Sequence, residues 1–368
     1  MKSFVLNTQG DFWGTVRGFF RGLLTAGVVD LVLVPQETSS GRSVVSTLVR
    51  DPEKLVAPDP FAPLVLVSQA KVLGHLTFKD PKARIAAVCR PCEVRAAYEL
   101  VKLKQVDLSR LLLIGVDCLG TLDPEVFRAR LSGSGLKDLS EDWVASMRSG
   151  AASGVRSACE VCVEAVSGNV AANIGVVGTS PDQLVVEIKH ELADEIAGAL
   201  GLSAGEAGER AKALAALRTR REDARKTRFS QWRQAVPDLP ALMAEMAMCL
   251  KCGNCRRACP ICYCKECVFD GRIFDHESSS YVRWASRKGL IEMPTDTLLF
   301  HLTRLNHMGT SCVNCGMCES ACPADLPLAT LFAAASERIQ AIWNYVPGRS
   351  LDDPLPLSTF REEELEPR

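Results

Sequence analysis

The sequence predicts an α/β N-terminal domain followed by a mainly α-helical ferredoxin domain that holds two iron–sulfur clusters. Three observations support this fold class. Short apolar runs alternate with helical segments over the first 200 residues, and one cysteine motif occurs twice in the last third of the chain. The chain has 368 residues, of which 47% are hydrophobic, so it can bury two sizeable cores.

Residues 1–200 are expected to form the α/β domain. Apolar runs of strand length alternate there with stretches of helical periodicity, which is typical of a sheet covered by helices. Helices are expected at 14–26 and 191–200. The runs predicted as strands are 31–35, 63–67, 85–88, 111–116, 174–177 and 184–188.

Residues 201–238 are expected to form a basic helical linker. Nine basic residues occur between Arg210 and Arg233, and only three acidic residues lie in or next to this stretch. A solvated helix face is the favoured interpretation of such a pattern, and a docking surface for an acidic partner is the alternative. Asp238 is expected to cap the following helix, which leads to Cys249.

One cysteine motif occurs twice within residues 239–345. Each copy has cysteines at positions 1, 4, 7 and 11 followed by a proline, which is the run found in bacterial ferredoxins. The copies are Cys249, Cys252, Cys255, Cys259 and Pro260, and Cys312, Cys315, Cys318, Cys322 and Pro323. Gly253 and Gly316 occupy the same place in the two copies and permit the tight turn that aims three sulfurs at one cluster.

This motif predicts two 4Fe–4S clusters with crossed ligation, because the first three cysteines of a copy bind one cluster and the fourth binds the other. Cys322 is therefore expected to join the first three cysteines of the first copy, and Cys259 those of the second. Cys249 and Cys312 lie 63 residues apart, farther than in compact ferredoxins, and the intervening 298–308 is predicted to be helical. The region 239–345 is thus expected to be a helical dicluster domain.

Two other interpretations of the repeat are weaker. Structural zinc sites use two cysteine pairs per ion, which fits two runs of four cysteines poorly. Clusters that only stabilise the fold are a second alternative. Crossed ligation, however, holds two clusters at a fixed short separation, and an electron relay needs that separation.

Five cysteines of the α/β domain indicate a third 4Fe–4S cluster. Each lies at the end of an apolar run or beside a predicted helix start, where α/β sheets place their ligand sites and where the helix dipole favours an anion. A buried, unreactive thiol is the alternative for any single one of them. These cysteines are Cys89, Cys92, Cys118, Cys159 and Cys162.

Four short segments around these cysteines carry a family resemblance. They are Arg-Pro-Cys-Glu-Val-Arg-Ala at 90–96, Gly-Val-Asp-Cys at 115–118, Cys-Glu-Val-Cys at 159–162 and Ala-Asn-Ile-Gly-Val-Val-Gly at 172–178. With them, roughly residues 60–180 resemble the beta subunits of coenzyme F420-reducing hydrogenase and F420-dependent formate dehydrogenase. The C-terminal part resembles the dicluster domains of heterodisulfide-reductase-associated proteins. Segments 307–312 and 345–350 are similar to a formate dehydrogenase beta group found beside such reductases.

The resemblance implies a ligand set and a second cofactor for the α/β domain. In the family, a flavin near the cluster exchanges a hydride for single electrons, so FAD is expected in the vicinity of Asn173 and Gly178. The ligands of the third cluster that the resemblance implies are Cys92, Cys118, Cys159 and Cys162.

The remaining cysteines can be interpreted in two ways. The chain has sixteen cysteines, which make four sets of four, so the remaining ones would form a fourth 4Fe–4S cluster that links the two domains. Spare or zinc-binding thiols are the alternative. The residues concerned are Cys89, Cys262, Cys264 and Cys267.

A short polar series precedes the second copy of the motif. His301, Arg304 and His307 follow helical spacing there. Such residues usually pack or cap a helix, and a hydrogen bond to a cluster sulfur, which would tune the cluster, is the alternative.

Charge and composition limit the partners and the location. The net charge of −1 does not favour nucleic acid as a partner. The first ten residues lack the pattern of a signal peptide, and charges interrupt the apolar stretch 12–34, so neither export nor membrane insertion is expected. Sixteen cysteines without an export signal indicate metal ligation in the reducing cytoplasm. Residues 346–368, rich in proline and acidic residues, are expected to form an extended C-terminal tail that lies on this protein or on a neighbour.

The leading hypothesis is an iron–sulfur electron-transfer subunit of a cytoplasmic formate dehydrogenase or hydrogenase type complex. It would relay electrons between a catalytic or flavin site and a heterodisulfide-reductase-like partner. A flavin-dependent oxidoreductase that acts directly on coenzyme F420 or a similar hydride carrier is the second hypothesis. The third is an interaction module whose clusters only shape a docking surface. Independent catalysis is thus less favoured than electron transfer.

Overall fold

A computed structural model describes residues 1–79, 82–205 and 208–358. Its N-terminal part is built on one sheet with the strand order β1-β7-β6-β5-β4-β2-β3. Four strands in the middle of this order, β2, β4, β5 and β6, are parallel, and the flanking strands pair antiparallel. The strands are β1 (Lys2–Asn7), β2 (Leu31–Glu37), β3 (Val44–Val49), β4 (Ile85–Cys89), β5 (Leu111–Val116), β6 (Ala172–Gly175) and β7 (Gln183–Ile188).

Helices cover both faces of this sheet. Along β4, Ala86 and Val88 belong to the core beneath α1 (Phe12–Thr25) and α6 (His190–Leu200). The alternate residues of β4 belong to a second core beneath α2 (Gln69–Leu76) and α3 (Pro91–Lys102). This alternation follows from the two-residue period of a strand and confirms the α/β class of the N-terminal part. Two further helices, α4 (Pro124–Arg148), broken at Gly135, and α5 (Ser157–Glu160), follow β5.

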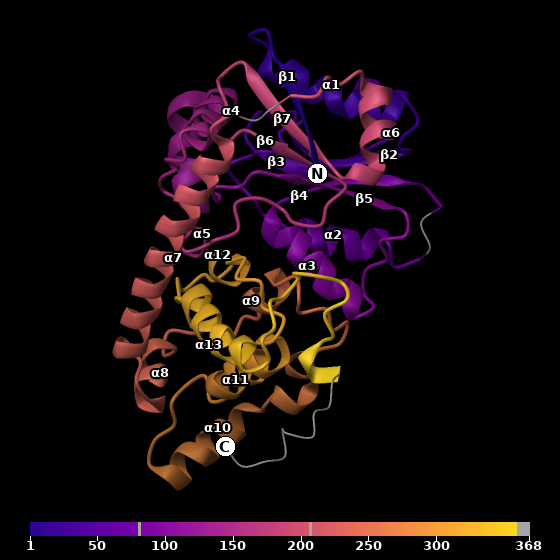
Figure 1. The fold of residues 1–368 in the computed structure, drawn as a ribbon. Coiled ribbons are helices and arrows are strands. Elements are labelled where there is room, and N and C mark those ends of the chain that lie inside the picture. The colour runs from indigo at the N-terminus through magenta and orange to yellow at the C-terminus, as the bar shows by residue number, and fades with distance from the viewer. Residues whose placement is uncertain (80–81, 206–207, 359–368) are drawn as a thin grey trace.

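The described residues from 208 onward contain helices and no strand. Figure 1 shows these helices below the α2–α3 side of the sheet, with the long α7 running alongside both parts. The helices are α7 (Arg210–Ala235), α8 (Leu239–Glu245), α9 (Asn254–Ala258), α10 (Ser278–Lys288), α11 (Thr297–Met308), α12 (Met317–Ser320) and α13 (Leu328–Ile342). The described residues also form the 3-10 turns η1 (Pro52–Lys54), η2 (Val268–Asp270), η3 (Arg272–Phe274) and η4 (Pro356–Ser358).

Helix α7 and the start of α8 join the two parts. Most of α7 is exposed, but Arg210, Leu217, Arg221 and Phe229 are buried along its length. Asp238 caps α8 by accepting a hydrogen bond from the Ala241 amide, at the place expected from the sequence. No helix among the described residues is long and apolar enough to cross a membrane.

The strand predictions differ from the structure in three places. The edge strands β1 and β3 were not predicted, whereas the strand predicted at 63–67 is absent. That segment is irregular, and its backbone binds other loops: the Pro63 carbonyl accepts from the Leu122 amide, and the Ala62 carbonyl from Arg90. Pro60 and Pro63 also lack the amide hydrogen that a sheet ladder requires.

The described part of the C-terminal tail is fixed to helix α3. The Tyr345 hydroxyl donates to the buried Glu99 carboxylate at 2.6 Å, and the Gly348 amide donates to the same oxygen at 2.8 Å. The Pro347 carbonyl accepts from Arg95 Nε at 2.9 Å. Gly348 has a φ of +70°, and a Cβ there would lie 2.4 Å from the Arg95 Cα, so glycine is required. Residues 345–349 therefore hold the start of the tail on this protein, and residues 359–368 fall outside the described part.

We expect Tyr345→Phe to loosen this tail. The variant loses a hydrogen bond to a carboxylate, an interaction that contributes about 1.5–3 kcal/mol. Limited proteolysis should therefore cleave the tail about tenfold faster or more, because local opening becomes more frequent.

Ser350→Ala is the matched control, since Ser350 contacts only its own loop at Asp352. Equal cleavage of Tyr345→Phe and the wild type would show that the hydroxyl does not hold the tail.

Candidate functional site

The carboxyl ends of β4 and β5 present cysteines at one edge of the sheet. Cys89 ends β4, and Cys92 follows in the first turn of α3, where Pro91 starts the helix. Cys118 follows β5. Parallel strands bring these ends together, since Cys89 pairs with Gly115 across the β4–β5 ladder. This edge is where open α/β sheets bind their ligands.

The first cysteine set consists of four thiols at this edge. In addition to burial, the nearby Cys118 and Cys162 raise the pKa of Cys92, and the nearby Cys159 and Cys162 raise the pKa of Cys118. Burial is the larger cause and raises the pKa of Cys118 to about 11. The structure thus brings together the four residues that the family resemblance implies: Cys92, Cys118, Cys159 and Cys162.

The second cysteine set combines three cysteines of the first motif with the last cysteine of the second. All four line one small enclosed space between the motif loops and helix α11. Cys252 is the exposed member. Neighbouring thiols add to the effect of burial in raising the pKa of Cys249 and Cys255. The set is Cys249, Cys252, Cys255 and Cys322.

The third cysteine set is the reciprocal combination. Burial first, and then Cys259, Cys315 and Cys312, raise the pKa of Cys318. In the two motif loops, Gly253 and Gly316 both adopt positive φ, at +75° and +71°. The two loops therefore turn in the same way at their glycines. The fourth cysteine of each motif lies with the first three cysteines of the other motif. The set is Cys259, Cys312, Cys315 and Cys318.

The first and third sets lie side by side. Burial and Glu93 are the larger causes of the raised pKa of Cys92, and Cys315 of the third set is the next. A Cβ on Gly316 would lie 2.5 Å from the Ala158 Cβ, so the second motif loop packs directly on α5. The three sets consequently form a series from the sheet edge, through the third set, to the second set with its exposed Cys252.

Buried arginines accompany these thiols. Arg156 donates to Met317 Sδ and to Ser320 Oγ, both at 3.3 Å. Burial disfavours the charge of Arg156, yet thiolates at Cys159, Cys92 and Cys315 together raise its pKa. Near the first set, Arg221 donates to the Cys162 carbonyl at 3.0 Å.

Helix α11 places two side chains against the second set. His301 Nε2 lies 3.3 Å from Cys249 Sγ, and Arg304 Nη1 donates to Cys255 Sγ at 3.1 Å. Burial, and then Arg304, lower the pKa of His301 to about 4, so the imidazole is neutral at pH 7. His307 is exposed. The hydrogen bonds to sulfur proposed from helical spacing are thus available to His301 and Arg304.

The donor chemistry of the three sets fits 4Fe–4S clusters. Each set offers four thiols, and the buried Arg156 and Arg304 have no carboxylate partner among the described residues. A cluster held by four thiolates is anionic and would balance these charges. In the described ranges, no three His, Cys, Asp or Glu side chains converge closely enough for a single metal ion. A four-iron cluster is larger than one ion and holds its thiolates farther apart.

The other four cysteines have dissimilar surroundings. Cys89 is fully buried in the core beneath α3. Cys262 donates to Cys259, which lowers the pKa of Cys259 to about 6, and it also contacts Met308 Sδ at 3.7 Å. Cys264 is exposed in a surface groove, and Cys267 is half-buried.

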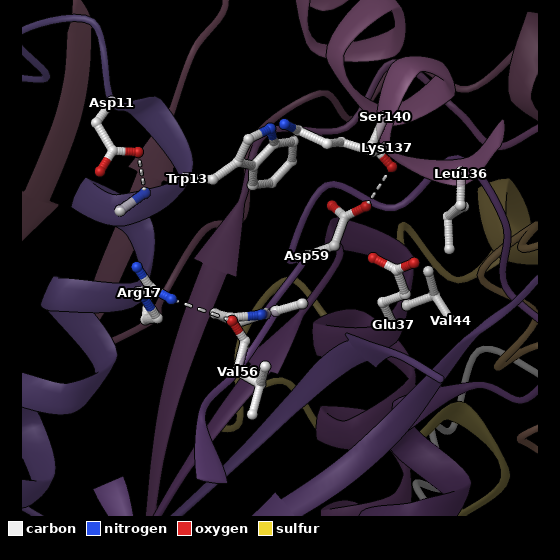
Figure 2. Close-up of a pocket in the computed structure, with 13 residues that line it drawn as sticks. Asp11, Trp13, Arg17, Glu37, Val44, Val56, Asp59, Leu136, Lys137 and Ser140 are labelled. Carbon is white, nitrogen blue, oxygen red and sulfur yellow. Dashed lines mark hydrogen bonds between the residues drawn. The ribbon is translucent and has the colours of Figure 1, made fainter. Parts of the chain in front are cut away.

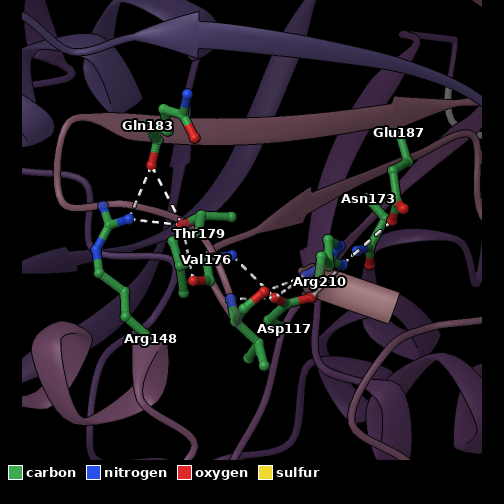
Figure 3. Close-up of polar contacts among 9 residues, drawn as sticks. Asp117, Arg148, Asn173, Val176, Thr179, Gln183, Glu187 and Arg210 are labelled. Carbon is green, nitrogen blue, oxygen red and sulfur yellow. Dashed lines mark hydrogen bonds and ion pairs between the residues drawn. The ribbon is translucent and has the colours of Figure 1, made fainter. Parts of the chain in front are cut away.

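Asn173 lies against the buried ion pair of Asp117 and Arg210 (Figure 3), and Gly178 packs against the backbone of Arg210. Arg210 Nη2 donates to Asp117 Oδ1 at 2.8 Å, and Asn173 Nδ2 lies 3.4 Å from the same oxygen. A Cβ on Gly178 would lie 2.9 Å from the Arg210 Cα. Asp117 also accepts from the Val176 amide at 2.8 Å, so this network fixes the turn after β6 to the start of α7.

A cavity of about 200 Å³ lies elsewhere along the carboxyl edge, between the start of α1, the end of β2 and the second half of α4 (Figure 2). Trp13, Arg17 and Lys137 line it together with the buried Asp59, which accepts a 2.7 Å hydrogen bond from Ser140. Burial raises the pKa of Asp59 to about 6, against the opposing effects of Ser140 and Arg90. This cavity was not predicted, although an acidic residue between two prolines in an apolar stretch was a usable signal.

The pKa of Asp59 predicts a pH-dependent stability. Because its folded-state pKa lies above the unfolded value of 3.8, the folded protein holds the proton more tightly, and this stabilisation is lost as pH rises through about 6. Between pH 5 and 8 the wild type should lose about 1.4 kcal/mol that Asp59→Asn does not lose. Anaerobic urea unfolding at the two pH values measures the difference.

Leu136→Ala serves as the control for this prediction, since Leu136 lines the same cavity but does not titrate. Its stability relative to the wild type should be equal at both pH values. A pH-independent difference for Asp59→Asn would contradict the assignment.

Comparison with known proteins places the whole chain beside one kind of redox subunit. It is 26% identical to the F420-dependent formate dehydrogenase subunit beta of Methanocaldococcus jannaschii, over 95% of this chain and 94% of that protein. It is 27% identical to the F420-dependent formate dehydrogenase 1 subunit beta of Methanococcus maripaludis, over 95% and 93% of the two chains.

A solved structure and the family models complete the comparison. A chain of the xenon-derivatised F420-reducing NiFe hydrogenase complex from Methanosarcina barkeri aligns with a TM-score of 0.46 and 12% identity, over 62% of this chain and 92% of that one. No protein-family model matches the sequence.

Proposed function

From its full-length similarity to F420-dependent formate dehydrogenase beta subunits, we propose that this chain is an iron–sulfur electron-transfer subunit of a cytoplasmic formate dehydrogenase or hydrogenase type complex. It would accept electrons in the N-terminal domain and deliver them, through a ferredoxin domain formed by residues 239–345, to a heterodisulfide-reductase-like flavoprotein. The single observation that carries this proposal is the series of three cysteine sets, whose thiols are buried or half-buried up to the exposed Cys252 at its end.

The three sets would each hold one 4Fe–4S cluster, whose chemistry is the storage and release of single electrons. The protein supplies the thiols, excludes water and fixes the order of the sets. The capping interactions of Glu93 hold the loop of the first set, because its carboxylate accepts from the Arg90 and Gln69 amides, both at 2.8 Å. Close packing of Gly316 on Ala158 fixes the third set beside the first.

A second candidate function is a flavin-dependent oxidoreductase that acts on coenzyme F420 or a similar hydride carrier. The cavity beside Asp59 favours it, because the cavity lies on the carboxyl edge and Arg90 acts electrostatically on both Asp59 and Cys118. Whole-ligand pockets usually measure about 300–1,000 Å³, so this cavity suits the ring of a flavin and not a whole FAD. The vicinity of Asn173 and Gly178 offers less space, since Arg210 fills it.

Iron and sulfide quantification tests the primary proposal. The anaerobically reconstituted chain should contain about twelve irons, which is four for each of three clusters. Cys92→Ala combined with Cys118→Ala should remove about four of them. The matched control is Cys264→Ala combined with Cys267→Ala, which should leave the iron content unchanged.

Three results of this measurement would change the proposal. Fewer than about eight irons in the wild type would refute a relay of clusters. About sixteen irons, with a loss in the control variant, would establish the fourth cluster of Cys89, Cys262, Cys264 and Cys267. Clusters that dithionite cannot reduce would support the interaction module instead.

Flavin binding tests the second candidate function. The chain incubated with excess FAD should retain about one flavin, and Ala57→Trp, which fills the cavity, should reduce retention at least tenfold without loss of iron. Val45→Trp is the control, because Val45 is exposed on the neighbouring β3. Equal flavin retention in both variants would place the flavin elsewhere, and no retention by the wild type would refute this function.

A further inference from the structure

Arg304 is a buried cation in the interior of the helical part. Its side chain is only 3% exposed and lies between two aromatic rings, with Cζ 5.7 Å from the Phe300 centroid and 4.6 Å from the Phe332 centroid. The guanidinium donates through Nη1 to Cys255 Sγ at 3.1 Å and through Nη2 to the Cys255 carbonyl at 3.3 Å. The side chain therefore has one orientation, fixed on both sides by packing and at its tip by Cys255.

The guanidinium acts on two cysteine sets at once. It opposes the burial that raises the pKa of Cys255 in the second set, and it does the same for Cys318 in the third set. Its Nη2 also lies 3.8 Å from Met308 Sδ, which in turn lies 3.9 Å from Cys259 Sγ of the third set. Arg304 consequently lies between the two sets that the crossed motif creates.

No carboxylate within residues 1–79, 82–205 and 208–358 balances the charge of Arg304. None of the described acidic side chains forms an ion pair with Arg304, and its Nε has no hydrogen-bond partner. Arg210, by contrast, is a deeply buried arginine that is paired with both Asp117 and Glu187. An isolated charge in a protein interior is costly unless an anion accompanies it, so the two sulfur sets are the counter-charge of Arg304.

We infer that Arg304 sets the reduction potentials of the second and third cysteine sets together, as a fixed positive charge shared between two clusters. This inference rests on the proposed function, because it needs both sets to hold a cluster. Reduction adds one negative charge to a set, and a nearby buried cation favours that charge in a medium of low dielectric constant. One residue would thus keep both potentials high and close together, which lets electrons pass in sequence from the third set to the second.

His301 gives a useful contrast on the same helix. Among the cysteine sulfurs of the described residues, its hydrogen-bond contact is with Cys249 of the second set, at 3.3 Å. A hydrogen bond from His301 can affect only the second set, whereas the charge of Arg304 reaches both. A shift of both potentials in the same direction is therefore the signature of Arg304.

Redox titration of the full chain, monitored by electron paramagnetic resonance, tests this inference. In Arg304→Gln, the ratio of oxidised to reduced cluster at the wild-type midpoint should rise about tenfold for both sets, which is a fall in midpoint of about 59 mV for one electron. Arg304→Lys keeps the charge and should change the ratio less than about threefold. Arg218→Gln removes an exposed arginine and should leave the ratio unchanged.

A second pair of variants tests the charge without removing Arg304. Met308 lies one turn along α11, with Sδ 3.8 Å from Arg304 Nη2. Met308→Glu would place a carboxylate beside the guanidinium and should lower both potentials, whereas the neutral Met308→Gln should not. These variants decide the matter if Arg304→Gln does not assemble its clusters.

The outcomes separate this inference from the proposed function. A wild type with too little iron for two clusters refutes the proposed function before any potential is measured. Normal iron content with unchanged potentials in Arg304→Gln or Met308→Glu would overturn the inference about Arg304 and leave the proposed function standing. Failure of both charge variants to assemble, while Arg304→Lys and Met308→Gln assemble, would make Arg304 a residue for cluster loading and would also overturn it.

Discussion

The carboxyl edge of the parallel strands is the constraint on which the rest of the molecule depends. The β4–β5 and β5–β6 ladders hold Cys89, Gly115 and Asn173 in register, so the loops that follow these strands must leave the sheet together. The first cysteine set forms from those loops and from α5. The helical part then packs on the same edge, because the second motif loop can approach α5 only where Gly316 has no side chain. One sheet edge therefore determines where the first cysteine set lies and why the second motif packs beside it.

Compensation of buried charge is the second organising principle. Two buried carboxylates hold the scaffold: Asp117 is paired with Arg210, and Glu99 is bonded to Lys102 and Tyr345. The arginines beside sulfur, Arg156 and Arg304, form no ion pair with a carboxylate in the described part of the chain. This division separates structural ion pairs from charges that need a further anion. It supports cluster binding independently of cysteine spacing, because free thiols are neutral and would leave both arginines uncompensated.

The sequence predicted well what depends on local order along the chain. The strands that carry Cys89 and Cys118 are continuous apolar runs, and the crossed sets follow from the spacing of the two motifs. It predicted poorly what depends on pairing in space. Segment 63–67 is as apolar as a strand, but local apolarity does not show whether a backbone joins a ladder. Helical spacing indicated that Arg304 could reach a cluster sulfur, and Asp59 between two prolines was a signal for a buried acid. Neither pattern shows which distant residues complete the cavity or surround the guanidinium, because those residues come from other parts of the sequence.

The two parts of the chain share one hydrophobic core, and this bears on how the sets stay in order. Residues of β4 and α3, such as Ala87 and Ala97, belong to the same buried cluster as Phe300 and Phe332 of the helical part. A relay requires short, constant separations between its sites, because a hinge between them would interrupt it. A continuous core resists such a hinge, since separating the parts would expose apolar surface at a cost of about 25 cal/mol for each Å². Packing therefore joins the N-terminal part and the helical part across the predicted linker at residues 201–238.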